Sequence, residues 1–130
     1  MKLQTATRLG LYAVLELARD PNRTMSAADL AQRFDVSTHH LAKVLRTLST
    51  AGLVLAERDA SGGYRFTGNR RRVTLMDIVS LFEPAPGARP EEPGEDTDIG
   101  SALQRVLTEV DEIAEATLRS ISLETMLKAT

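Results

Sequence analysis

The chain has 130 residues, of which 42% are hydrophobic, and this size suits one globular domain with a modest core and room for an appended helix. It contains no cysteine, which excludes disulfides and any thiolate-held zinc or iron–sulfur site. No apolar run reaches the ~18 residues of a membrane span, and the start lacks the basic-then-apolar pattern of a secretion signal, so we expect a cytoplasmic protein with no membrane partner.

The net charge of −2 conceals two halves of opposite sign. Residues 1–73 carry 12 Lys and Arg against 6 Asp and Glu, which gives +6. Residues 74–130 carry 4 against 12, which gives −8. A basic first half joined to an acidic second half is typical of a protein that binds nucleic acid with one part and a protein partner with the other.

The first predicted element is a helix from Thr7 to Ala18 whose apolar residues are spread widely enough for it to be largely buried. Pro21 and Asn22 end this helix. Lys2 and Arg8 lie near its start, where they could reach a phosphate or simply keep the surface soluble.

Two short helices separated by a three-residue break follow the first helix. Ser26 begins one of them, and Asp29 three residues later forms a capping box with it. Ser37 begins the other, and Asp35 between them can adopt a left-handed turn. The second helix has an apolar stripe at helical spacing, formed by Leu41, Val44, Leu45 and Leu48. This spacing predicts a helix-turn-helix.

The outer face of the second helix is polar and cationic, and no acidic residue lies between Ser37 and Leu55. Donors and cations at the leading end of such a helix suit base edges and phosphates in a major groove. The alternative, a solvated face of an ordinary helical hairpin, would normally mix both signs of charge. The residues predicted to contact DNA from this motif are Ser26, Ser37, Thr38, His39, His40, Lys43 and Arg46. The two histidines are adjacent and point about 100° apart, so they do not suit chelation of one metal ion.

A β-hairpin is predicted directly after the helix-turn-helix, and Gly52 is placed to end the helix before it. The strands are Leu53 to Arg58 and Gly63 to Thr67, joined by a glycine-containing loop. This order of elements is that of a winged helix. The residues predicted to contact DNA from the wing are Arg58, Gly62, Gly63 and Arg65, although Gly-Gly could also be simply a tight turn. Arg65 is expected to point away from the face that Tyr64 and Phe66 share.

The rest of the chain predicts a short helix, a loop and a long helix. Thr74 and Asp77 form a second capping box, and Pro84 ends the short helix. Residues 84–98 are rich in proline and acid and are expected to be a mobile loop. Ser122 then begins a short terminal helix.

The long helix carries an apolar seam with the spacing of a coiled coil. The predicted dimerisation residues are Ile99, Leu103, Val106, Val110 and Ile113. A second stripe of Leu107, Ala114 and Leu118 could cover the helix's own domain. A broad core helix in a monomer is the alternative, but with so little other protein to bury it a homodimer is favoured.

We therefore expect a mainly α-helical fold with a small β-hairpin wing. The expected division is a winged helix-turn-helix DNA-binding domain over residues 1–83, a flexible acidic loop over 84–98, and a dimerisation helix and tail over 99–130.

Several stretches together resemble the BadM/Rrf2 type of bacterial winged-helix regulators, and within it most closely the nitric-oxide-sensitive repressors. The resembling stretches are Met1-Lys2-Leu3, Val36-Ser37, Leu48 to Val54, Ser61 to Arg65, and Met76 to Val79 running to Glu83-Pro84. The resemblance covers nearly the whole chain and implies a dimeric, site-specific DNA-binding protein that controls transcription, usually as a repressor on a palindromic operator.

The chain departs from this family at the loop before the long helix, where the iron–sulfur members place three cysteines. This chain has none, and Arg8 stands where some nitric-oxide sensors take an acidic ligand from the first helix. From this departure we expect a regulator without an iron–sulfur cluster, with no cofactor and no bound metal.

The sequence offers no phosphate-cradling glycine loop and no Ser/His/Asp spacing, so we do not expect an enzyme. The alternative to a DNA-binding regulator is a winged-helix module that docks a protein through its acidic half. The effector of a regulator could be a small molecule, a partner protein or none.

Overall fold

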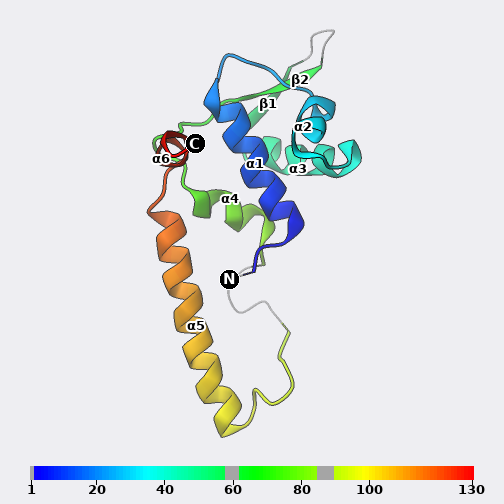
Figure 1. Ribbon diagram of the computed structural model, residues 1–130. Coiled ribbons are helices and arrows are strands. Elements are labelled where there is room, and N and C mark those ends of the chain that lie inside the picture. The colour runs from blue at the N-terminus through cyan, green and yellow to red at the C-terminus, as the bar shows by residue number, and fades with distance from the viewer. Residues whose placement is uncertain (1, 58–61, 85–89) are drawn as a thin grey trace.

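The computed structural model describes residues 2–57, 62–84 and 90–130. Its elements are α1 (Thr5–Arg19), α2 (Ala27–Phe34), α3 (Thr38–Thr50), β1 (Val54–Glu57), β2 (Gly63–Phe66), α4 (Leu75–Phe82), α5 (Asp98–Arg119) and α6 (Leu123–Lys128). Figure 1 shows α1 to α4, the hairpin and α6 gathered in one body, from which α5 extends as a long arm. The expected fold class, mainly helical with a two-stranded wing, is confirmed.

The predicted starts of α2 and α4 are confirmed by their caps. The Ser26 hydroxyl accepts from the Asp29 backbone N–H at 3.0 Å, and the Asp29 carboxylate accepts from the Ser26 N–H at 3.1 Å. Thr74 and Asp77 form the same reciprocal pair at the start of α4. Each box satisfies two backbone donors that a helix start leaves without partners.

The turn between α2 and α3 has the left-handed residue that the sequence predicts. Asp35 has φ 54° and ψ 53°, and the Val36 N–H donates to the Ala31 carbonyl at 3.0 Å. Gly52, with φ 79°, reverses the chain after α3 and leads it into the wing. Because these conformations suit Asp and Gly, the local sequence fixes the angle at which α3 leaves α2 and the place where the wing begins.

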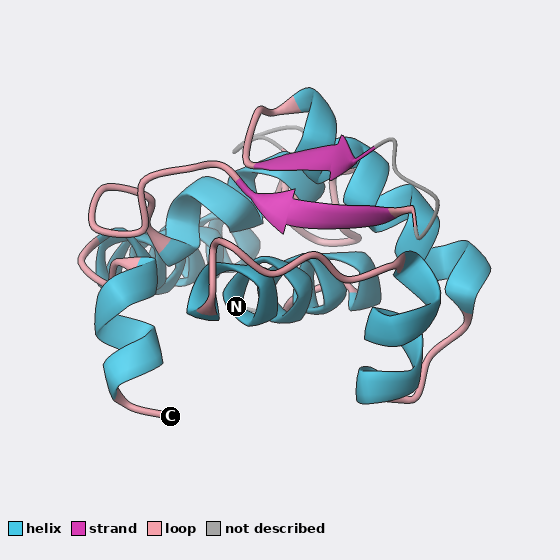
Figure 2. Ribbon diagram, turned by 90° about the horizontal axis from the view of Figure 1, so that it is seen from above, coloured by secondary structure: helices cyan, strands magenta, loops and turns pink. Residues whose placement is uncertain are grey.

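The wing is an antiparallel pair in which Val54 lies opposite Phe66 and Glu57 lies opposite Gly63. A short bridge adds the backbone of Met25 to β2, since the N–H and carbonyl of Met25 both pair with Tyr64, at 2.9 and 2.8 Å. This contact ties the wing to the segment before α2. Figure 2, from above, shows the two strands lying across the helical body.

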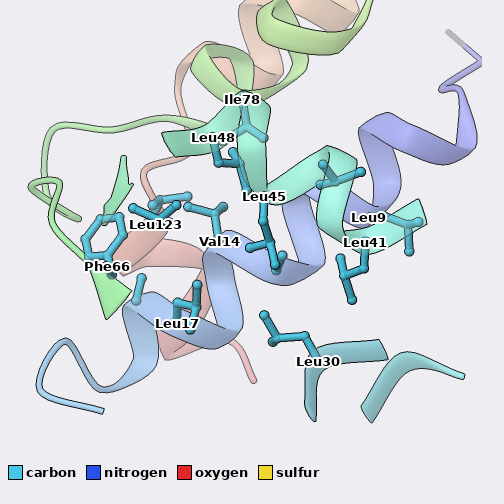
Figure 3. Packing of buried hydrophobic residues seen from close by; sticks show 14 of the residues in the cluster. Leu9, Val14, Leu17, Leu30, Leu41, Leu45, Leu48, Phe66, Ile78 and Leu123 are labelled. Carbon is cyan, nitrogen blue, oxygen red and sulfur yellow. The ribbon is translucent and has the colours of Figure 1, made fainter. Parts of the chain in front are cut away.

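The core lies between α1 and α3 and is completed by residues from every other part of the body. Figure 3 labels the contributing side chains Leu9, Val14 and Leu17 of α1, Leu30 of α2, Leu41, Leu45 and Leu48 of α3, Phe66 of β2, Ile78 of α4 and Leu123 of α6. Most of them are fully buried. Burying one such side chain stabilises the fold by about 1.5–3 kcal/mol, so α3 is held firmly by its apolar stripe.

The short terminal helix α6 packs into this core and does not form a separate tail. Leu123 is fully buried, and its N–H donates to the Val73 carbonyl at 2.9 Å. The Leu75 N–H donates to the Ile121 carbonyl, also at 2.9 Å. The end of the predicted 99–130 segment thus shares a core with residues 1–83, and the division of the chain into domains stays a prediction.

The long helix α5 is largely uncovered in the single chain. No residue of α5, every one of which the structure describes, is buried. The second apolar stripe covers its own domain only towards the end of the helix, where Leu118 packs against the core, while Leu107 remains 47% exposed. The second stripe thus packs on its own domain only near the end of α5, because the first half of the helix extends beyond the body.

The described part of the acidic segment before α5 is folded into hydrogen-bonded turns. The Glu95 N–H donates to the Glu92 carbonyl at 3.2 Å, and the Thr97 N–H to the Gly94 carbonyl at 3.1 Å. These turns lie so close to the first turn of α5 that a Cβ at Gly100 would overlap the Gly94 carbonyl oxygen. Residues 85–89 lie outside the described chain, and the flexibility of the whole segment stays a prediction.

Candidate nucleic-acid interface

The outer stripe of α3 is the strongest candidate for a functional surface. His39, Lys43 and Arg46 are exposed and follow one another at spacings of four and three residues, so they lie on one side of the helix. Leu41, Val44, Leu45 and Leu48 are buried on the other side. The helix is thus fixed by one face and presents cations and donors on the opposite one.

The cations of this stripe have no acidic partner among the described residues. In the part of the chain that the structure describes, neither Lys43 nor Arg46 forms an ion pair. Their charge is therefore available to attract an anion such as a phosphate. The threonine hydroxyls beside them bond to the helix itself, since Thr47 and Thr50 donate to the carbonyls of Lys43 and Arg46 at 3.4 and 3.0 Å.

Some residues at the leading end of α3 cap the helix, and some are exposed to solvent. The exposed Ser37 caps the helix by accepting from the His40 N–H at 3.1 Å. Thr38 is exposed at the first position of the helix, whereas His40 is half-buried. Ser26, at the start of α2, is half-buried and holds its capping box. Each capping hydroxyl accepts through its oxygen, which leaves its own proton for donation.

The structure places the predicted DNA-contacting residues of the wing in different environments. Arg58 lies outside the described residues. Gly62 is exposed with φ 52°, a backbone conformation that favours glycine. Gly63 is buried, and a Cβ there would come within 3.0 Å of the Thr24 Cβ. A glycine at position 63 therefore allows close packing against Thr24 within the chain. Its predicted approach to a DNA groove stays a prediction.

Arg65 does point away from Phe66, as the sequence predicts, but its charge is partnered. Its Nε donates to Oε1 of Glu57 on the neighbouring strand. The side chains of Arg65 and Glu57 are 38% and 31% exposed. Sequence reasoning missed Glu57, although the strand register, once known, places it diagonally across from Arg65.

A second charged group that the sequence did not reveal holds the motif to α1. The Glu16 side chain is 8% exposed, and its carboxylate lies 3.2 Å from Arg23 and 3.8 Å from both Arg19 and Arg33. Arg23 also donates to the Glu16 carbonyl at 3.0 Å. Because these arginines come from α1, the following loop and α2, Glu16 joins three segments that precede α3.

The chemistry of the donor set does not suit a metal. The chain has no cysteine, and among residues 2–57, 62–84 and 90–130 no three His, Asp or Glu side chains gather as a metal site would require. Arg8 is exposed on α1. Within the same ranges, no helix is long and apolar enough to cross a membrane.

A family model described as "Rrf2: Iron-dependent Transcriptional regulator" matches residues 3–129. The chain belongs to the Rrf2 family. A relative from Rhodopseudomonas palustris, BadM, named as a candidate HTH-type transcriptional regulator, is 51% identical over 128 residues, which cover 98% of this chain and 82% of BadM. Rrf2 proteins are transcriptional regulators that bind DNA, so the expectation that the chain is not an enzyme is confirmed.

Solved Rrf2-type structures superpose on nearly the whole chain. CymR (YrzC), described as the global cysteine regulator of B. subtilis, is 29% identical with a TM-score of 0.81, covering 100% of this chain and 98% of CymR. IscR of T. potens is 28% identical with a TM-score of 0.78, covering 99% of this chain and 88% of IscR. The family description names iron, but the residues of this chain do not fit a thiolate-bound iron site.

Proposed function

We propose that this Rrf2 protein is a sequence-specific repressor that binds a palindromic operator as a homodimer. The observation that carries the proposal is the exposed stripe of His39, Lys43 and Arg46 on α3, opposite a fully packed face. A rigid helix of about 10–12 Å diameter fits the major groove. Lys43 and Arg46 would hold phosphates, and Thr38 and His39 at the leading end would read base edges.

The exposed apolar seam of α5 supports the dimer. Its members are Ile99 (79% exposed), Leu103 (56%), Val106 (56%), Val110 (49%) and Ile113 (62%). Monomeric proteins rarely leave so continuous an apolar stripe in water. A second copy of α5 would cover it through a two-fold contact and would set two copies of α3 about one helical turn of DNA apart.

We further propose that regulation proceeds without an iron–sulfur cluster. Such clusters are held by cysteine thiolates, with histidine replacing some of them in a minority of proteins. The absence of cysteine and the exposed cation Arg8 on α1 support a different input, either a small molecule or a partner protein. The protein would act in the cytoplasm, where a bacterial chromosome lies.

The α3 proposal is tested by fluorescence anisotropy with an operator duplex and a scrambled duplex. Lys43→Ala and Arg46→Ala should weaken binding to both duplexes and make the log–log salt dependence shallower by roughly 0.9 for each phosphate that is no longer neutralised. His39→Ala should instead reduce the preference for the operator by about 1–3 kcal/mol. Arg71→Ala, on an exposed residue that pairs with Glu124 of α6, is the matched control for loss of one cation.

If the α3 variants behave like the Arg71 control, α3 is not the DNA-binding surface. A protein that docks partners through its acidic half would show that pattern. With its net charge of −2, such a protein would bind a duplex only weakly.

A further inference from the structure

In the described part of the wing, the outer face carries one cation and one anion that the strand register brings together. Arg65 lies opposite Leu55, and Glu57 lies two residues further along β1, opposite Gly63. Side chains alternate along a strand, so Leu55, Glu57 and Arg65 share the face that points away from the buried Val54 and Phe66. Diagonal neighbours on one face of an antiparallel pair lie within reach of long side chains, so Arg65 can reach Glu57.

The pair is closed in the structure and is partly withdrawn from water. Arg65 Nε donates to Oε1 of Glu57, and both side chains are more than half covered. A partly covered pair is screened less by salt than an exposed one. Glu57 is also the last β1 residue of the ladder before the loop, so its carboxylate stands at the base of the wing tip.

The cations of α3 and the described cation of the wing differ in whether an acid pairs with them. The outer stripe of α3 has Lys43 and Arg46 without ion-pair partners in the described chain, whereas the described cation of the wing is matched by an acid. Attraction to any DNA backbone rises with each uncompensated cation near it. A pair whose charges cancel adds little to that general attraction.

We propose that Glu57 is a positioning residue that holds Arg65 on the wing and so lowers the affinity of the protein for non-specific DNA. The pair acts as a neutral unit, and the general attraction to phosphates comes from α3. Specific sites then gain over random sequence because this pair contributes no indiscriminate charge. This inference rests on the proposed DNA binding through α3.

The magnitude follows from counterion release. One additional phosphate neutralised changes the slope of log affinity against log salt by about 0.9. Relative to 1 M salt, where the ionic contribution vanishes, this makes the affinity at 0.1 M salt about eightfold higher. Glu57→Gln frees Arg65 and should therefore tighten binding to a random duplex by about eightfold at that salt concentration. Glu57→Gln combined with Arg65→Gln again gives a neutral pair and should restore the wild-type slope.

The experiment measures the dissociation constant of a random-sequence duplex by fluorescence anisotropy across a series of salt concentrations. The full-length proteins are the wild type, Glu57→Gln, the double variant, and Glu57→Asp, which keeps the charge. Glu124→Gln is the control, because Glu124 on α6 pairs with Arg71 at 3.1 Å and this substitution makes the same charge change away from the wing. Thermal melting of each variant checks that it is folded.

The expected result is a steeper slope for Glu57→Gln alone, with wild-type slopes for the double variant and Glu57→Asp. A double variant whose slope is shallower than wild type by about 0.9 would overturn the inference, since Arg65 would then hold a phosphate despite Glu57. An unchanged slope for Glu57→Gln, or an equal change in Glu124→Gln, would also overturn it. If the wild type binds no duplex even at low salt, the proposed function itself fails, and the inference fails with it.

Discussion

Replacing Val110 by Asp should separate the proposed dimer while leaving the single chain folded. Val110 is 49% exposed in the single chain, so an aspartate there meets water and costs at most about 0.5 kcal/mol. In a dimer that covers the seam, the same carboxylate would be buried. Its neighbours three and four residues away are Val106, Leu107, Ile113 and Ala114, none of which is charged.

An unpaired buried charge costs about 3–5 kcal/mol. Because both subunits of a homodimer carry the substitution, this cost counts twice, about 6–10 kcal/mol. Since about 1.4 kcal/mol is a factor of ten, the dissociation constant of the dimer should rise by roughly ten-thousandfold or more. Sedimentation velocity over a range of protein concentrations measures this change, and circular dichroism melting at low concentration reports on the fold of the monomer. Operator binding should fall with dimerisation, because two half-sites must be occupied together.

The matched control is Thr108→Asp, which places the same carboxylate on the polar face of α5. Thr108 is exposed and accepts from the Gln104 side-chain amide at 3.3 Å, and an aspartate can accept there too. This variant should remain a dimer. If Val110→Asp and Thr108→Asp dimerise with equal affinity, the apolar seam is not the interface, and the reasoning from its exposure is refuted.

Three further predictions concern the body of the protein and its chemistry. Gly10→Ala should be destabilising in urea denaturation. Alanine gains about 1 kcal/mol in helix propensity, but its Cβ would overlap a Phe82 ring carbon, and such overpacking costs about 1–3 kcal/mol. A stabilised variant would mean that the ring moves aside freely. Glu16→Gln should lower the free energy of unfolding by about 1 kcal/mol, because a charge-assisted bond to Arg23 is weakened, and an unchanged midpoint would contradict a structural role. Protein purified without oxygen should be colourless and its DNA affinity indifferent to nitric oxide, whereas stoichiometric iron and a nitric-oxide-sensitive affinity would contradict the account.

The features that the sequence predicts well are those set by neighbouring residues. Capping boxes at Ser26 and Thr74 join groups three residues apart, and the left-handed Asp35 and Gly52 follow from local backbone preference. The buried stripe of α3 follows from helical periodicity. These short-range rules were enough to place the helix-turn-helix and the wing.

The features that the sequence could not predict depend on contacts between distant segments. Thr7 is fully buried and donates its hydroxyl to the Glu83 carboxylate, which also accepts from the Gln4 N–H at 3.3 Å. This contact spans 76 positions in the chain, and no local pattern marks it. The pairing of Arg65 with Glu57 likewise depends on strand register, which loop length alone does not fix.

The most direct test of the central claim is selection of operator sequences from fragmented genomic DNA by the purified protein, followed by footprinting of the enriched fragments. We expect a small set of sites, each with two inverted half-sites about one helical turn apart. The preference should be lost in a variant that combines Thr38→Ala with His39→Ala, while that variant melts at the wild-type temperature. Enrichment of no sequence over bulk DNA, or of sites with a single half-site and no two-fold symmetry, would contradict the account.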